Sequence, residues 1–372
     1  MVAPITRLSS PQTAPDIEFV VSEAAESLSG LHIFTDPAVR CKDYEIGCEW
    51  FDAVRTTASP QLTELLAPFQ SQPGSSNAWC ALDALVAEAP ADVPGFLRHL
   101  EAMPPDEVWL QLLGFHHRHQ PTAALREAMV GAGHGELDPL LSLLERDDDP
   151  VIRRWVPQVV RLFGADADRA KAMVVATLGR WHSEVFSKQW AEIAPILTWD
   201  AEHKRRMAEE RSLFEVVEEA TNGGEYAPEV GIDRLLLIPS YLSRPWVNYD
   251  RHRNTLVMQY PVGEDALAPS VEEARRRRIL RLAKVLADES RLRALRRLAE
   301  SPCTLQELAD DLDLGKSTMH HHLAALRAAG LLRVRLGEKR YSLRVGPLSE
   351  VSGLLGDYLG SAKTRSSHGR RR

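Results

Sequence analysis

A run of short polar and basic side chains late in the chain has the residue types that contact nucleic acid. Lys316, Ser317 and Thr318 follow a glycine, and His320 and His321 come shortly after them. At the start of a helix, such groups and the positive end of the helix dipole can approach phosphates and reach base edges. Basic side chains suited to phosphate or minor-groove contacts follow downstream. These are Arg327, Arg333, Arg335, Lys339 and Arg340.

Two other chemistries fit this segment less well. Gly315 and Lys316 begin a stretch that looks like the end of a GxxxxGK[ST] phosphate-binding loop, but Asp310 stands where the first glycine belongs and no strand leads into it. The consecutive histidines 320–322 would point in different directions on a helix, because successive residues turn by about 100°. The sequence therefore favours DNA contact or packing for these histidines and predicts no metal site.

The elements needed to position these residues can be read around them. We expect helices over residues 275–286, 290–300, 304 to about 314 and 316–329, then a hairpin of strands 332–336 and 340–343. Thr304 and Glu307 fit a capping box at the start of the third helix. Met319, Leu323 and Leu326 share one face of the fourth helix, so we expect them in the core. The polar residues around Lys316 then face away from the core.

This series of elements closely resembles the ArsR-type winged helix regulators. The matching stretches are LADESRLRALRRLAE, TLQELADDLDLGKSTMHHHLAALRAAGLL and RVRLGEKRYSLR. The resemblance implies a transcriptional regulator, usually a repressor, whose recognition helix and wing bind double-stranded DNA. It also implies a homodimer joined through the helices expected at 275–286 and 348–359, and so a pseudo-palindromic operator.

The chain departs from the metal-sensing members of that family. Those members carry a cysteine pair in the third helix, where this chain has Thr304 and Gln306, with Cys303 just outside. One thiol does not supply the three or four ligands of a thiolate site. We therefore expect no metal and no cofactor. The resemblance leaves residues 1–270 unexplained.

Charge is divided between the two ends of the chain. The net charge of −7 combines 22 Lys and Arg against 12 Asp and Glu from residue 271 onward with the opposite excess before it. A basic module on an acidic body is typical of nucleic-acid binding confined to one end, and it makes self-inhibition plausible. With no apolar stretch of membrane length or signal-peptide type, we expect a cytoplasmic, nucleoid-associated protein without membrane contact.

The predicted fold class is mainly α. Residues 1–16 are expected to be disordered, and residues 17–268 to form a helical sensor or interaction domain with a small antiparallel β meander near 233–261. Residues 269–361 are expected to form the winged helix and dimerisation domain, followed by a basic disordered tail, 362–372.

Some side chains of the N-terminal part have types found in binding sites. All eight tryptophans lie before residue 250; most suit a core, and some suit an apolar ligand pocket. The candidates for ligand contact and for coupling to the DNA-binding part are Tyr241, Trp246 and Tyr249.

A histidine cluster and a pair of cysteines are interpreted without a metal-binding or redox role. His116, His117 and His119 are interpreted as a polar loop or helix end rather than a metal site. Cys41 and Cys48 are interpreted as isolated residues, because they have neither a CxxC spacing nor a basic neighbourhood beyond Lys42.

No catalytic motif is found, so the sequence predicts a regulator and not an enzyme. In the first hypothesis, the N-terminal domain senses a small organic ligand or a partner and alters DNA affinity. In the alternative, it is a protein-interaction or autoinhibitory scaffold without a small-molecule effector.

Overall fold

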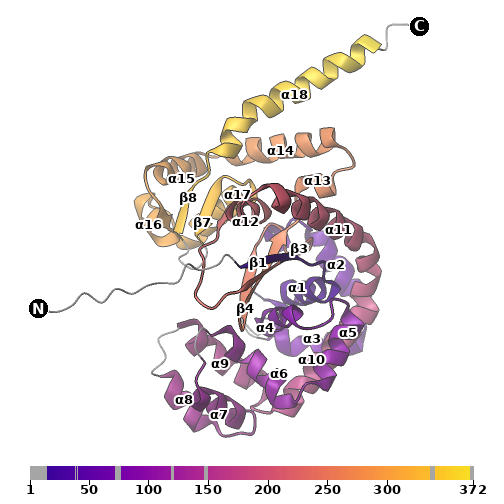
Figure 1. The fold of residues 1–372 in the computed structure, drawn as a ribbon, viewed down its shortest axis with the longest axis vertical. Helices are drawn as coiled ribbons and strands as arrows, with labels where there is room; N and C mark the ends of the chain where they lie inside the picture. Colours follow the sequence, from indigo (N-terminus) through magenta and orange to yellow (C-terminus); the bar gives the residue numbers. More distant parts are fainter. Residues whose placement is uncertain are drawn as a thin grey trace, which may run out of the picture.

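The computed structural model describes residues 15–37, 39, 41–71, 77–118, 121–145, 150–335 and 340–368. It shows a mainly helical body, residues 15–267, with a winged helix, residues 271–368, at one end (Figure 1). The body helices are α1 (Glu23–Thr35), α2 (Cys48–Thr57), α3 (Pro60–Gln70), α4 (Asn77–Asp83), α5 (Val93–Ala102), α6 (Pro105–Leu112), α7 (Ala123–Ala132), α8 (Leu137–Leu144), α9 (Pro150–Phe163), α10 (Ala167–Trp181), α11 (Ser187–Glu210), α12 (Leu213–Ala220) and α13 (Glu264–Leu267). Short turns are η1 (Cys41–Asp43), η2 (Ala84–Ala87), η3 (Phe115–His117) and the π-helical η4 (His182–Phe186).

Local sequence explains where several of these helices begin. The side chains of Ser22, Ser59 and Thr122 each accept a hydrogen bond from a backbone N–H three residues later, which satisfies one free donor of the first turn. Ser212 and Glu215 form a capping box at α12. The helices bury apolar side chains in a common core in which Trp79, Trp109 and Trp181 are fully buried. These tryptophans are core residues, as expected for most of the eight.

The body contains a mixed β-sheet rather than the predicted antiparallel meander. Its order is β1 (Asp16–Phe19), β3 (Arg234–Ser240), β5 (Thr255–Pro261) and β4 (Asn248–His252). Both β1 and β5 are parallel to β3, and β4 is antiparallel to β5. The meander prediction is matched only in part: β4 and β5 form an antiparallel pair, but the β3–β4 connection carries the chain past the position that β5 then fills, so β3 and β5 are parallel.

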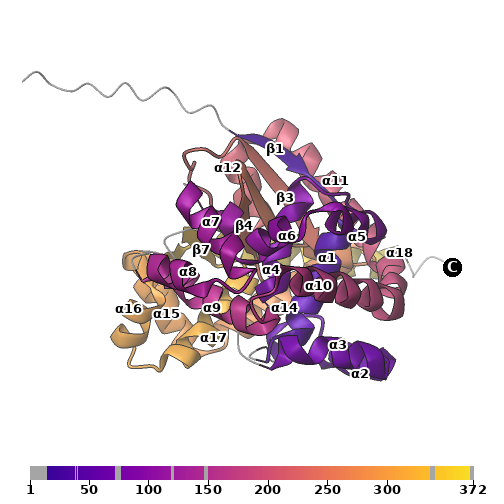
Figure 2. The ribbon, with the colours of Figure 1, turned by 90° about the horizontal axis from the view of Figure 1, so that it is seen from below.

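Alternating side chains of this sheet enter two different cores. Leu236 and Ile238 on β3 face the main helical core, whereas Leu235 and Leu237 pack with residues of α11 and α12. Burial on both faces explains why β3 is a continuous apolar run. Figure 2 shows the strands lying among helices of the body. β1 begins at Asp16, the last residue of the segment predicted to be disordered; residues 1–14 of that segment lie outside the described residues.

The winged helix contains the helices and the hairpin that the sequence predicts, in the predicted order, and one short strand, β6, that was not predicted. They are α14 (Val271–Leu286), α15 (Glu289–Glu300), β6 (Cys303–Thr304), α16 (Leu305–Asp311), α17 (Lys316–Ala328), β7 (Leu332–Arg335), β8 (Arg340–Leu343) and α18 (Gly346–His368). Two helix ends differ from the prediction. α14 starts at Val271, before the predicted residue 275, and α18 continues into the segment predicted as a tail, 362–372. The apolar side chains of this unit form a core of their own, separate from the two cores of the body.

Two further findings bear on the predictions. Cys41 and Cys48 are joined in a disulfide, so their interpretation as isolated residues was wrong. Their spacing does not reveal this, because the turn between α1 and α2 that brings their Cα atoms to 4.8 Å has no simple sequence signature.

Within the described ranges, no helix combines the length and hydropathy needed to cross a lipid bilayer.

Candidate nucleic-acid interface

The first turns of α17 present the predicted polar residues to solvent. Gly315 is the N-cap of the helix, and Met319, Leu323 and Leu326 are buried in the core of the winged helix, as predicted. The opposite side of the helix lies outside this core. The side chains exposed there are Lys316, Ser317, Thr318, His320 and His321.

The preceding elements fix the direction of this helix. Thr304 and Glu307 form the predicted capping box at the start of α16, with the Glu307 carboxylate accepting the Thr304 N–H at 2.7 Å. Asp288 caps α15 by accepting the Arg291 N–H, which lowers the pKa of that carboxyl. His322 lies on the side of α17 facing Asp288, 3.9 Å away, and burial lowers its pKa. His322 is thus a packing residue, whereas the side chains of His320 and His321 are exposed.

The wing carries its arginines on the two paired strands β7 and β8. Arg333 and Arg335 are exposed on β7. Arg340 begins β8 and donates to the Pro302 carbonyl at 2.8 Å, with Glu307 at 3.6 Å. Lys339 lies outside the described residues.

A strand of the body extends the wing sheet. β2 (Gly224–Glu225) pairs in parallel with β7, so that the sheet order is β2, β7, β8 and β6. The Val334 N–H donates to the Gly223 carbonyl at 2.8 Å. Gly223 has φ +107, and a Cβ at this position would lie 2.0 Å from the Leu332 carbonyl oxygen. Only glycine allows the body and wing backbones to approach this closely.

Acidic side chains of the body pair with the wing arginines around this contact. The Glu218 carboxylate accepts hydrogen bonds from Arg333 at 3.1 Å and from Arg344 at 2.9 Å. Arg344 also pairs with Glu219 at 3.0 Å, and Arg335 lies 3.5 Å from Glu225. We call the group Glu218, Glu219, Asn222, Gly223, Gly224 and Glu225 the wing clamp.

The wing clamp also reaches the C-terminal end of α17. Asn222 donates from its side-chain amide to the carbonyls of Arg327 and Ala328, at 3.0 and 3.2 Å, and so satisfies acceptors that the helix leaves free. Arg327 itself is half-buried, and burial lowers the pKa of its guanidinium. This residue therefore lies at the back of the winged helix, not on the exposed side of α17 with Lys316.

Two features of the sequence bear on the wing clamp: the charge pattern and a helix end. The acidic excess of the N-terminal part predicts that it can face a basic partner, and residues 222–224 are recognisable as a helix end. Neither feature identifies which glutamate meets which arginine, because the contacts join residues more than 100 positions apart. Glu218, Glu219 and Glu225 were therefore not predicted as functional residues.

The three aromatic residues predicted to bind a ligand lie in different surroundings. The Trp246 ring stacks on His320 of α17, with 5.8 Å between ring centroids and 19° between planes. The Arg244 guanidinium lies over the Tyr241 ring, 5.8 Å from its centroid. Tyr249 lines a cavity of about 40 Å³ together with Cys80, Asp83 and Gln259. The structure thus does not bring the three rings together in one pocket.

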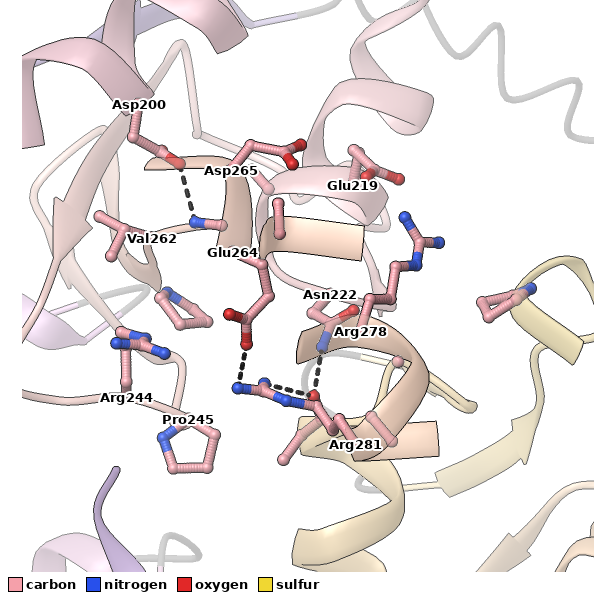
Figure 3. Close-up of a pocket in the computed structure, with 18 of the residues that line it drawn as sticks. Asp200, Glu219, Asn222, Arg244, Pro245, Val262, Glu264, Asp265, Arg278 and Arg281 are labelled. Atoms are coloured by element: carbon pink, nitrogen blue, oxygen red, sulfur yellow. Dashed lines mark hydrogen bonds and ion pairs between the residues drawn. The ribbon is translucent and has the colours of Figure 1, made fainter. Parts of the chain in front are cut away.

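A larger cavity of about 320 Å³ lies between the body and the winged helix. Lys204 and Glu264 contribute to it from the body, and Arg278 and Arg281 from α14. Figure 3 shows Arg281 extending toward Glu264, with which it forms an ion pair, and Asn222 of the wing clamp at the same edge. Charged side chains from both parts line it, together with apolar ones such as Met207 and Leu354.

The histidines near residue 116 face acidic groups of the body. His117 Nδ1 lies 3.0 Å from an oxygen of Asp250, and His116 Nε2 lies 3.7 Å from Glu107. Burial lowers the pKa of His116 to about 4. His119 lies outside the described residues. Among the described residues, no group of three or more histidine, cysteine, aspartate and glutamate side chains has the arrangement of a metal site.

Comparison with known proteins gives one match, and it coincides with this interface. No curated protein and no solved structure matches the chain significantly. Residues 288–334, from the N-cap of α15 to the middle of β7, match the family model described as "Bacterial regulatory protein, arsR family". Together with the exposed polar end of α17, this match shows that the C-terminal part of the chain carries the helix-turn-helix of the arsR regulators, which indicates DNA-binding transcriptional regulation.

Proposed function

We propose that this protein is a transcriptional repressor that binds a pseudo-palindromic operator as a homodimer, and that its body sets the affinity for DNA. The N-terminal end of α17 would enter the major groove, where Lys316 meets a phosphate and His320 and His321 reach base edges. The wing would contact phosphates beside that groove. The body would lower the affinity by holding the wing.

The observation that carries this proposal is that arginines of the wing are already paired with glutamates of the body. Arg333, Arg335 and Arg344 have the charge that suits DNA phosphates, and each lies against a glutamate of the wing clamp. A phosphate and these carboxylates compete for the same guanidinium donors. DNA contact by the wing therefore requires that the wing clamp open or shift.

The nature of the interface supports such an opening. The winged helix has a core separate from those of the body. Apart from the stack of Trp246 on His320, the contacts described between the two parts are ion pairs and hydrogen bonds. Polar contacts between units that each have a core can separate without exposing a large apolar surface. Exposed ion pairs contribute about 1 kcal/mol or less each, so DNA binding is strong enough to replace them.

Exposed apolar side chains support a dimer through α14 and α18. Leu280 of α14 is 55% exposed, and Leu355 and Leu359 of α18 are 40% and 62% exposed. The two helices pack on each other, with Arg278 donating to Glu350 at 2.5 Å, and α18 extends away from the body (Figure 1). A second copy seated on these helices would bury the leucines.

The cavity between the two parts supports a small organic effector. A ligand that fits there touches the body and α14 at once, so it binds two relative positions of these parts unequally. That inequality is what allosteric control requires. If the body is instead an autoinhibitory scaffold alone, the wing clamp acts in the same way without an effector.

The test removes the negative charge of the wing clamp in the full-length protein. Wild-type protein first selects a duplex from a random-sequence pool, and fluorescence anisotropy then measures affinity for that duplex. The variant Glu218→Gln, Glu219→Gln, Glu225→Gln is expected to bind about fivefold or more tightly and with a steeper salt dependence. The matched control changes Glu202, Glu209 and Glu210, exposed glutamates of α11, to glutamine.

Three results would contradict the proposal. If wild-type protein selects no duplex, DNA binding is wrong. If the wing-clamp variant and the control bind equally, control by the wing clamp is wrong. If sedimentation shows a monomer on the operator, the dimer is wrong.

A further inference from the structure

The disulfide between Cys41 and Cys48 closes the turn that leads from α1 into α2. It forms a ring of eight residues, 41–48, at the surface of the body. Cys48 is exposed to solvent and Cys41 is half-buried, so a small reductant or oxidant can reach the sulfur of Cys48. By contrast, Cys303 is buried and burial raises the pKa of Cys80 to about 12, which makes Cys80 a poor nucleophile.

The ring is bonded to the segment of the body that touches the recognition helix. The Glu45 N–H donates to the Arg244 carbonyl at 3.0 Å, and the Asp43 carbonyl accepts from the Trp246 indole at 3.1 Å. The ring of Trp246 in turn stacks on His320. Two bonds from the disulfide-closed ring therefore fix the aromatic side chain that contacts α17.

The same ring also holds the first helix of the winged helix directly. The Glu45 carboxylate accepts from Arg281 of α14 at 2.9 and 3.0 Å through its two oxygens, and it also pairs with Arg244. Glu45 lies at the centre of the eight-residue ring, whose backbone the disulfide restricts. Opening the disulfide would widen the range of positions available to Glu45 and Asp43.

We propose that Cys41 and Cys48 form a reversible redox site that controls the docking of the winged helix on the body. The proposal rests on the function proposed above and specifies its regulation. With the disulfide closed, Glu45 and Trp246 reinforce the docked arrangement. When the two thiols are free, this contact loosens, the wing clamp opens more readily and DNA affinity rises.

The chemistry is a two-electron exchange between the cysteine pair and small molecules of two classes. A hydroperoxide oxidises the pair: the sulfur of one thiol attacks the terminal peroxide oxygen and the O–O bond breaks. The thiol becomes a sulfenic acid, and the rest of the hydroperoxide leaves as an alcohol, or as water when the oxidant is hydrogen peroxide. The second thiol then displaces the sulfenic oxygen as water and forms the disulfide. A dithiol reverses this by thiol–disulfide exchange and is itself oxidised to a disulfide.

The experiment compares reduced and oxidised full-length protein. Wild-type protein is treated with dithiothreitol or with hydrogen peroxide, the thiol state is read by mass after maleimide labelling, and the affinity for the selected duplex is measured. The reduced form is expected to bind about fivefold or more tightly. Hydrogen–deuterium exchange should be faster in residues 41–48 and 243–249 of the reduced form.

Two variants separate the redox site from other causes. Cys41→Ser, Cys48→Ser keeps Cys80 and Cys303 and should bind like the reduced protein, with no response to peroxide. Trp246→Phe keeps a ring beside His320 but removes the donor to the Asp43 carbonyl. Its redox response should fall to about half the wild-type response or less. Thermal unfolding of both variants checks that they are folded.

The outcomes distinguish this proposal from the proposed function. If both redox forms bind DNA equally, or if peroxide never closes the pair, the redox site is wrong while DNA binding stands. If the exchange pattern changes with thiol state but neither form binds any duplex, the proposed function is wrong while the redox contact stands. An undiminished response in Trp246→Phe would overturn the route through that residue.

Discussion

The two DNA-facing parts of the winged helix differ in what the body does to them. The N-terminal end of α17 is exposed, and the Trp246 ring of the body stacks on its His320. The wing, by contrast, shares a sheet with β2 and has Arg333 and Arg335 against glutamates of the wing clamp. The N-terminal end of α17 is thus exposed to solvent, whereas arginines of the wing are already paired with glutamates of the body.

This difference indicates how control of DNA binding would be divided. The residues suited to reading bases remain accessible, whereas those suited to phosphates are held. Because phosphate contacts supply much of the affinity and little of the sequence preference, we expect the body to change how tightly DNA is bound rather than which sequence is chosen.

The largest effect is expected from the exposed end of α17. Lys316→Ala with His321→Ala should weaken binding to the selected duplex at least about tenfold, because one phosphate contact and one base contact are lost. Arg335→Ala should cost less than about twofold in the wild-type background, since that side chain is engaged by Glu225. Anisotropy titrations at several salt concentrations measure both. If the two variants lose DNA affinity equally, the inferred difference between α17 and the wing is wrong.

A change of opposite sign is expected when the wing is released. Gly223→Ala places a Cβ against the Leu332 carbonyl, so β2 should separate from β7 and affinity should rise, by about fivefold or more. Exchange of the Val334 amide, which donates to Gly223, should accelerate.

Gly135→Ala is the matched control for this release. Gly135 has a similar backbone angle, φ +91, but no atom lies within 4 Å of an added Cβ. If both variants change DNA affinity equally, backbone strain and not the wing clamp is responsible.

A smaller gain is expected from Glu218→Gln alone. The neutral amide accepts hydrogen bonds less strongly than the carboxylate, which now serves both Arg333 and Arg344. We expect about twofold to threefold tighter DNA binding, and the gain should vanish at high salt, where the ion pairs are already screened. A gain that persists at high salt would show that charge is not the cause.

The smallest effect on DNA binding is expected from Glu26→Gln, in the core of the body. Burial raises the pKa of Glu26 to about 7, although it accepts the N–H groups of Tyr241 and Leu242. A raised pKa contributes stability at low pH that is lost as the pH rises through about 7. The variant should remove up to about 3 kcal/mol of this pH dependence, measured by denaturant unfolding between pH 4.5 and 8. A change in DNA affinity above about twofold would show that the two cores are coupled more strongly than their separation suggests.

The winged helix was predictable from sequence because its signals are local. The capping box at Thr304, the N-cap Gly315 and the buried face of α17 are each set by residues within one or two turns. The same holds for the exposure of Lys316 and its neighbours, which follows from the positions of Met319 and Leu323.

The body was less predictable because its decisive contacts are distant in sequence. The parallel pairing of β3 with β5 depends on where β4 is placed, and the ion pair of Glu218 with Arg333 depends on how two folded parts meet. The disulfide of Cys41 and Cys48 depends on the geometry of one turn. A charge balance predicts that such contacts are favourable but gives no partner for any one side chain.

The β2–β7 pairing has a consequence for the solubility of the protein. β7 is covered on its outer side by only the two residues of β2, and the backbone there is the one that another extended chain would use. When the wing clamp opens, that edge becomes available for pairing between molecules unless DNA covers it. By pairing with β7, the body keeps this edge strand from pairing with other molecules. Protein that is free of DNA and has an open wing clamp should therefore be the form most prone to aggregate.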